Sequence, residues 1–387
     1  MLVRKIPLLL TTCLVLGCPG STTETPDATI DLAPPTEGPV FPDGAPDLPE
    51  KDQLALVDQL IDQTTDGPGV DPCLAVTTDG MKLNPGCDLD FKANGPTAMG
   101  QFVNATTGNP AWLFVSGTKY WLFDPTAKAG QGAFTAGGKD IAAAVMALAP
   151  TNCTSLSPSG MPLNPGCDVG FQANGPTVVG TARTSGTTGV EGWLFTSGKK
   201  YWIYEPQSST GGAAAFVAAG ADVAAATMAL QPTNCTATGT DGTPLNPGCD
   251  VGYQANGPTA WGEFSNTSTG AAAWLFVSGP KYWMYDPVGG GQGQFTAAGA
   301  SLATLLASLP PACTAIAPDG TKINPGCDVT FQANGPTAVG EFRQPATAQV
   351  AWLFTSGKKF WLLDPTTLTF TAAGADISVP MRKLATQ

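Results

Sequence analysis

The chain repeats one sequence unit four times. A run of aromatic and apolar residues interrupted by a Ser-Gly pair begins at four positions about 80 residues apart, which are Leu113, Leu194, Leu275 and Leu353. Self-similarity at a fixed spacing indicates a repeat architecture, in which each unit buries its apolar surface against its neighbours. The sequence therefore predicts four similar units, spanning residues 73–150, 151–232, 233–310 and 311–387.

Cysteines recur in phase with the repeat. Four pairs share one spacing of fourteen positions: Cys73/Cys87, Cys153/Cys167, Cys235/Cys249 and Cys313/Cys327. In an exported protein such pairs indicate local disulfides, each contributing on the order of 3 kcal/mol through the entropy of the unfolded chain. A metal site is the weaker alternative, because two cysteines without histidine supply only half of a tetrahedral ligand set.

Each unit predicts mainly β structure. In the fourth unit, apolar runs separated by turn residues predict strands at 337–342, 351–355, 359–363 and 368–374. An Ala-rich segment after Asp140, and after Asp222 and Asp376 in other copies, predicts a short helix with an Asp N-cap. Four strands and a short helix cannot bury their aromatic side chains alone, so the units are expected to stack.

The third predicted strand carries a family resemblance. The pattern Phe-x-x-Gly-x-Lys-Tyr-Trp-x-x-Asp-Pro, at residues 114–125 and 276–287, resembles the blade motif of hemopexin-type repeats. Four such repeats close into a four-bladed β-propeller, so the resemblance implies that fold for residues 95–387. A string of four separate beads is the alternative architecture.

The chain differs from that family in three respects. Its units are longer, because a segment with two cysteines precedes each blade, and every unit has its own cysteine pair instead of one disulfide joining the first blade to the last. The first strand has two candidates: the Asp-x-x-Phe/Tyr segment after the second cysteine, or the later segment typified by residues 337–342. The later one is favoured, because it lies closer to the hairpin.

An aspartate follows the second cysteine of every unit. These residues are Asp88, Asp168, Asp250 and Asp328. The resemblance implies a ring of oxygen ligands for a calcium or sodium ion on the propeller axis. The alternative is a turn-capping aspartate beside a disulfide. Haem is not expected, because the chain has no histidine to ligate the iron.

Tryptophan also follows the repeat. Eight of the nine tryptophans occupy two repeat positions, which predicts packing between units: Trp112, Trp193, Trp274 and Trp352, and Trp121, Trp202, Trp283 and Trp361. The ninth, Trp261, stands where the other units have Met99, Val179 and Val339. As an aromatic residue that is not repeated, Trp261 is a candidate ligand contact; a locally larger core residue is the alternative.

The composition excludes several functions. The absence of histidine excludes Ser-His-Asp and Cys-His catalysis. A net charge of −12 argues against nucleic-acid binding, which needs a basic surface. Twelve of the thirty acidic residues lie in residues 19–72 with a single lysine, so the repeats themselves are nearly neutral.

The N-terminus reads as an export signal and an anchor. Arg4 and Lys5 precede an apolar run, 6–17, that is too short to span a bilayer. That run ends in Val-Leu-Gly-Cys, which resembles a bacterial lipobox and implies a signal peptide over 1–17 and a lipid on Cys18. Proline at the next position favours the outer membrane, since the retention aspartate known from enteric bacteria is absent.

Between the anchor and the repeats lie two further segments. Residues 18–50 are rich in Pro, Thr, Asp and Glu and predict an extended acidic tether. Residues 51–72 place Leu54, Val57, Leu60 and Ile61 at helical spacing. We expect a short amphipathic helix that caps the folded body; a helix that binds a partner is the alternative.

These expectations combine into one function. The sequence predicts an envelope-anchored lipoprotein whose propeller is a non-catalytic binding or adhesion module for a macromolecule. A glycan-binding module that uses Trp261 is the first alternative. A carboxylate-based hydrolase, acting through an acid that is not repeated such as Glu191 or Glu263, is the second.

Overall fold

A computed structural model describes residues 71–103, 110–130, 132–183, 191–206, 214–231, 235–265, 272–286, 293–343 and 350–384. The predicted signal peptide, Cys18, the tether and residues 51–70 lie outside this range. Within the described residues, no helix is long and apolar enough to cross a membrane.

The described chain forms four sheets of four antiparallel strands, each sheet built from consecutive strands. The first is β1 (Ala98–Val103), β2 (Pro110–Ser116), β3 (Lys119–Asp124) and β4 (Ala133–Asp140); the second is β5 (Val178–Arg183), β6 (Glu191–Ser197), β7 (Lys200–Glu205) and β8 (Ala215–Gly220). The third is β9 (Ala260–Ser265), β10 (Ala272–Ser278), β11 (Lys281–Asp286) and β12 (Gln294–Gly299); the fourth is β13 (Ala338–Arg343), β14 (Val350–Ser356), β15 (Lys359–Asp364) and β16 (Thr369–Gly374). These sheets are called blades 1 to 4, and the strands predicted in the fourth repeat are confirmed.

Short helices connect the blades. One helix follows the second cysteine of each unit: α2 (Leu89–Asn94), α5 (Val169–Asn174), α7 (Val251–Asn256) and α9 (Val329–Asn334). After the last strand of each blade come α4 (Ile141–Leu148), α6 (Val223–Leu230), α8 (Leu302–Ala307) and α10 (Ser378–Lys383), and α3 (Ala127–Gly130) follows β3. The 3-10 turns are η1 (Pro72–Leu74), η2 (Pro85–Cys87), η3 (Pro150–Cys153), η4 (Pro165–Cys167), η7 (Pro247–Cys249) and η9 (Pro325–Cys327).

The segment between each pair of cysteines is a small hairpin whose ends are joined by a disulfide. All four predicted disulfides are present, with Cα atoms 5.3 to 5.5 Å apart. The second tryptophan of each unit is fully buried and donates its indole N–H to a carbonyl of this hairpin: Trp121 to Lys82, Trp202 to Pro162, Trp283 to Pro244 and Trp361 to Lys322, at 2.9 to 3.1 Å. The extra residues of this long repeat therefore complete the core of their own blade.

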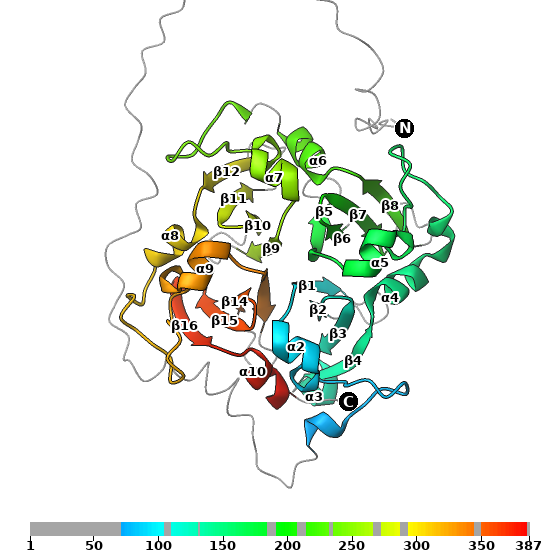
Figure 1. Cartoon of the computed structure of the whole chain (residues 1–387), viewed down its shortest axis with the longest axis horizontal. Helices are drawn as coiled ribbons and strands as arrows, with labels where there is room; N and C mark the ends of the chain where they lie inside the picture. The colour runs from blue at the N-terminus through cyan, green and yellow to red at the C-terminus, as the bar shows by residue number, and fades with distance from the viewer. Residues whose placement is uncertain are drawn as a thin grey trace, which may run out of the picture. The chain divides into compact units, whose positions relative to one another are not determined.

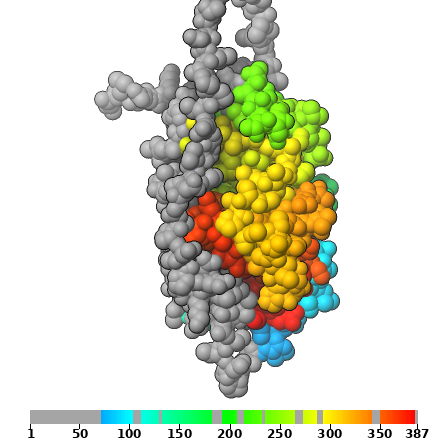
Figure 2. All heavy atoms as spheres, turned by 90° about the vertical axis from the view of Figure 1, so that its left-hand side faces the viewer, coloured from blue at the N-terminus to red at the C-terminus, as the bar shows by residue number. Residues whose placement is uncertain are grey.

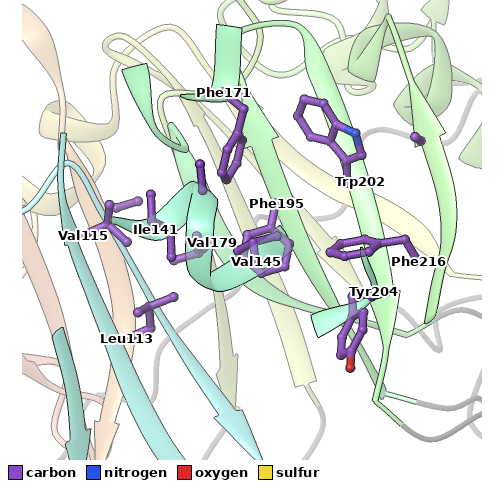
Figure 3. Close-up of a cluster of buried hydrophobic side chains, with 14 of the residues drawn as sticks. Leu113, Val115, Ile141, Val145, Phe171, Val179, Phe195, Trp202, Tyr204 and Phe216 are labelled. Carbon is purple, nitrogen blue, oxygen red and sulfur yellow. The ribbon is translucent and has the colours of Figure 1, made fainter. Parts of the chain in front are cut away.

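Apolar packing continues from one blade to the next. One cluster combines Leu113 and Val115 of blade 1 with Phe195 and Trp202 of blade 2. Figure 3 shows these side chains meeting around α4, whose Val145 lies between the two blades. Equivalent clusters join the other blades. The packing between units predicted from the repeated aromatic residues is confirmed.

A buried asparagine joins each hairpin to the preceding blade. The residues are Asn84, Asn164, Asn246 and Asn324, here called the Asn clamps, and all four are completely buried. The side-chain oxygen of Asn164 accepts from the backbone N–H of Gly166 at 2.8 Å, and its Nδ2 donates to carbonyls at the end of α4, including that of Ala149 at 2.9 Å. These carbonyls have no partner within the helix. One side-chain amide thus hydrogen-bonds the backbone of two segments, the hairpin turn and the end of the helix.

The same contact closes the ring. Asn84, in the first unit, donates to the carbonyls of Met381 at 2.9 Å and Leu384 at 3.0 Å, in the last unit. A Cβ added to Gly86 would lie 2.4 Å from the carbonyl oxygen of Ser378, so only glycine allows this approach. The innermost strands β1, β5, β9 and β13 contact one another in a complete cycle. Figure 1 shows the four blades around a common centre. The predicted four-bladed propeller is confirmed, and separate beads are excluded.

We predict that Asn84→Ala destabilises the whole propeller. The substitution removes the side-chain donor to the Met381 and Leu384 carbonyls and leaves the buried N–H of Gly86 without its acceptor, at a cost of about 2–4 kcal/mol in the free energy of unfolding. Urea unfolding of the full chain measures this cost. The matched control is Asn94→Ala, because Asn94 is exposed and hydrogen-bonds only within α2. An Asn84→Ala midpoint equal to that of the control would contradict closure through this residue.

Candidate functional site

One face of the propeller carries the four helices that follow the second cysteines. Each helix begins at the aspartate predicted as a possible ion ligand. The Oδ1 atom of Asp88 accepts from the N–H of Asp90 and Phe91, and Asp168, Asp250 and Asp328 cap their helices in the same way. Aspartate is a preferred N-cap because its carboxylate satisfies the free N–H groups of the first turn. In Figure 1 these helices lie in front of their blades, and Figure 2 shows the orange of α9 and the cyan of α2 along the same edge.

The second oxygen of each capping carboxylate pairs with a lysine from the hairpin turn. The four pairs have N–O distances of 2.5 to 2.9 Å: Lys119 with Asp88, Lys200 with Asp168, Lys281 with Asp250 and Lys359 with Asp328. Burial lowers the pKa of the Lys119 ammonium, but its hydrogen bonds to Asp90 and Asp88 outweigh this effect and raise that pKa above its usual value. The charges on this face therefore largely cancel.

These contacts bear on the predicted ion. In the described part of the chain, no three carboxylate or cysteine side chains lie close enough together to hold a metal. Asp88, Asp168, Asp250 and Asp328 have the geometry of helix caps, which was the alternative left open by the sequence. A calcium or sodium ion in the propeller stays a prediction.

Directly after each capping aspartate stands an exposed aliphatic residue. The four are Leu89, Val169, Val251 and Val329, here called the aliphatic ring, with exposed fractions of 78%, 78%, 79% and 78%. The next position is variable, with Asp90, Gly170, Gly252 and Thr330. Helix propensity does not explain three valines, because β-branching disfavours helices slightly. Single exposed aliphatic residues are ordinary; here the same exposed type recurs at four equivalent positions of one face.

The propeller axis holds a cavity of about 200 Å³. Three consecutive residues from the innermost strand of every blade line it: Met99, Gly100 and Gln101; Val179, Gly180 and Thr181; Trp261, Gly262 and Glu263; Val339, Gly340 and Glu341. The middle layer is glycine in all four blades. A Cβ on Gly100 would lie 2.7 Å from the carbonyl oxygen of Val179, so this glycine lets β1 and β5 approach.

The other two layers of the cavity break the fourfold symmetry. Trp261 is 8% exposed, and its ring packs against Phe276 with centroids 4.1 Å apart. Among the described residues, its buried indole N–H has no hydrogen-bond partner. In the next layer Glu263 accepts from the hydroxyl of Thr181 at 2.6 Å, and Glu341 lies in the same layer. The cavity is therefore lined by two carboxylates in one layer and by a single aromatic ring in another.

These positions locate the residues singled out from the sequence. Trp261 does line a cavity, but its small exposed fraction leaves little ring surface on which a sugar could stack. Glu263 lies beside it, whereas the side chain of Glu191 lies outside the described part. Sequence reasoning missed the aliphatic ring and Glu341. Aligning the four copies position by position exposes the ring, because Leu or Val follows every Cys-Asp pair.

Comparison with known proteins gives structural matches only. No protein-family model matches the chain, and no curated protein matches its sequence. The hemopexin-fold protein CP4 from cow pea matches with a TM-score of 0.44 and 10% identity, covering 74% of this chain and 96% of that one. A plant lectin with two metal binding sites from Cicer arietinum has a TM-score of 0.39 and 9% identity, over 70% and 86% of the two chains. LS24, a seed albumin from Lathyrus sativus, has a TM-score of 0.38 and 10% identity, over 70% of this chain and 85% of that one.

The hemopexin-like fold follows from the structure of the chain itself. Four sheets of four antiparallel strands, each followed by a short helix, are arranged in a closed cycle. The prediction of a hemopexin-like repeat domain is thus confirmed at the level of the fold, and each unit adds a disulfide-closed hairpin of its own.

Two equivalent glycines of the axial cavity provide a matched test. Gly100→Ala places a methyl group against the backbone of Val179, whereas a Cβ on Gly180 meets no atom within 4 Å. We expect Gly100→Ala to lower the free energy of unfolding by about 1–3 kcal/mol. Gly180→Ala should change it by less than about 0.5 kcal/mol. Urea unfolding of both variants checks this, and equal effects would contradict the described approach of β1 to β5.

Proposed function

We propose that this protein is a non-catalytic binding module, anchored in the bacterial envelope through a lipid on Cys18, that docks a partner protein on its aliphatic ring. The observation that supports this function is the ring itself: four aliphatic side chains, each nearly four-fifths exposed, at equivalent places on one face. Their chemistry favours a protein over a glycan, because sugars are bound by aromatic faces and polar groups, and the ring has neither.

The surroundings of the ring suit a docking surface. Beside each aliphatic residue the charge of the capping aspartate is already paired with a lysine, as in the 2.6 Å contact between Lys200 and Asp168. A partner therefore covers apolar atoms without stripping water from isolated charges, which is the costly part of many interfaces. The disulfides and Asn clamps hold the four positions in a fixed arrangement, so little conformational entropy is lost on binding.

The anchor in this proposal comes from the sequence. Residues 19–70 are 52 residues long and could extend up to about 170 Å from a lipid on Cys18. Their excess of acidic residues would keep the tether extended and away from an anionic membrane surface. The propeller would then meet partners at a distance from the outer membrane to which it is attached.

A reciprocal experiment tests the ring. In intact cells, crosslinking and mass spectrometry identify the partner of the wild-type chain. The variant with serine at Leu89, Val169, Val251 and Val329 should give at least about tenfold fewer of those crosslinks than the wild type, because serine removes the apolar contact area. It should unfold at the wild-type urea concentration, since the exposed side chains add little to stability.

The matched control changes other exposed aliphatic residues. Val76, Leu156 and Ile316 occupy equivalent places in the disulfide hairpins and are 50%, 62% and 58% exposed. Serine at these three positions should leave the crosslinks intact. Equal crosslinking by the ring variant and the wild type would overturn the proposal. Binding on a glycan array that is lost in Trp261→Ala would favour the glycan module instead, and polysaccharide cleavage that is lost in Glu263→Gln would favour the hydrolase.

The anchor has a separate test. Cys18→Ala should move the protein from the membrane fraction to the soluble fraction of the envelope, because no acyl chain then holds it. Mass spectrometry of the wild-type N-terminal peptide should show acylation at Cys18. Variant protein that remains in the membrane fraction, or a wild-type peptide without an acyl group, would rule out this anchor.

A further inference from the structure

A second cavity opens between blades 1 and 2. Its volume is about 520 Å³, and its wall is almost entirely apolar. One side consists of β2, β3 and α4, including Leu122, Ala144 and Leu148; the other consists of β6 and β7, including Trp193 and Tyr204. Figure 3 shows Leu113 and Tyr204 on opposite sides of Val145, all three of which line the cavity.

This cavity is a groove that opens on the surface, and Leu148 on its wall is 37% exposed. Apolar surface in contact with water costs free energy, which an apolar segment that covers it recovers. Its volume is that of a small-ligand site, or of the space that several aliphatic side chains occupy. Something apolar is therefore needed to cover Leu122, Ala144 and Leu148.

We propose that residues 53–62 of the same chain form a short amphipathic helix that docks in this cavity. Leu54, Val57 and Ile61 stand at positions i, i+3 and i+7, which is the spacing of helix residues that anchor in an apolar groove. A helix this short is marginal in water and needs a surface against which to fold. The segment would cover the apolar wall of the cavity, and the wall would give the segment a surface against which to fold.

The remaining chain offers no other occupant of this kind. The strand connections outside the described residues near blades 1 and 2 read NATTGN at 104–109, TSGTTGV at 184–190 and QSSTGGA at 207–213. Small and hydroxyl-bearing residues dominate these stretches, with one valine among them. Apart from the apolar run 6–17, which cleavage of the predicted signal peptide would remove, only residues 54–61 place several large aliphatic side chains close together outside the described range.

The docking is also possible in length. The described chain starts at Asp71, just before the disulfide hairpin of blade 1, where η1 contacts α10 of the last unit. From there the hairpin reaches the outer strand β4, where Asp79 approaches Lys139 within 3.8 Å. Lys139 pairs in the sheet with Tyr120, which lines the cavity. The nine residues 62–70 can span about 30 Å. The segment therefore begins on the side of blade 1 opposite the cavity, and this length lets it pass around the outer strand β4 to reach the cavity.

Hydrogen exchange on the full chain tests this proposal from both sides. In the wild type, amides of residues 53–62 should exchange at least about tenfold more slowly than in an unstructured peptide of the same sequence. The protection should vanish in Leu54→Asp/Ile61→Asp, and also in Ala144→Trp, which fills the cavity. The controls are Leu56→Asp, on the opposite side of the predicted helix, and Ala143→Trp, on the exposed side of α4, and both should retain the protection.

Each outcome decides the proposal. Absence of protection in the wild type would overturn it, as would protection that survives Ala144→Trp, because the segment would then pack elsewhere. Protection that grows with protein concentration would assign the cavity to a second copy and would overturn it too. A hydrophobic dye such as anilinonaphthalene sulfonate should bind Leu54→Asp/Ile61→Asp more tightly than the wild type. Equal dye binding by the two proteins would also contradict the docking.

Discussion

The buried side-chain amide of the Asn-Pro-Gly-Cys motif holds this propeller together. A short helix leaves several carbonyls without partners at its end, and burying them unpaired would cost more than the packing of so short a helix returns. Each Asn clamp supplies the missing donors while its oxygen fixes the turn that leads to the disulfide. The glycine two positions later allows the turn to touch the helix. These contacts join each hairpin to the preceding blade, and that of Asn84 joins the first unit to the last.

Much of this fold is predictable because its signals are local and repeated. The strand hairpins, the disulfides and the helix after Asp140 follow from turn residues, equal spacing and N-cap chemistry within a few positions. The contact of Asn84 with α10 is not predictable in that way. The Asn-Pro-Gly-Cys motif does not indicate which carbonyls the asparagine binds, and the Met381 carbonyl is 297 residues away in the sequence. The helix α2 escaped prediction because its six residues are too few for a clear period, although Asp88 gave its starting point.

The repeats separate what serves the fold from what serves a ligand. Residues copied into all four blades with buried contacts, such as Trp121 and Asn84, are explained by the fold alone. The aliphatic ring is copied without any such contact, and Trp261 with Glu263 departs from the copy inside the axial cavity. Sequence reasoning found Trp261 because it is an exception, and it overlooked Leu89 because exposed aliphatic residues are individually unremarkable. Exposure, which only the structure provides, distinguishes the two kinds of repetition.

The junction between the first and last units has a consequence for how the chain reaches this structure. Three of the Asn clamps join segments at most 19 residues apart, so each can form as soon as its own unit is made. The fourth waits for residues almost 300 positions downstream. Until they arrive, a three-bladed intermediate exposes a polar amide and the open side of an apolar core together. The fourth blade of another molecule fits the same surfaces. The chain's own fourth blade therefore competes with that of a neighbouring chain for this position.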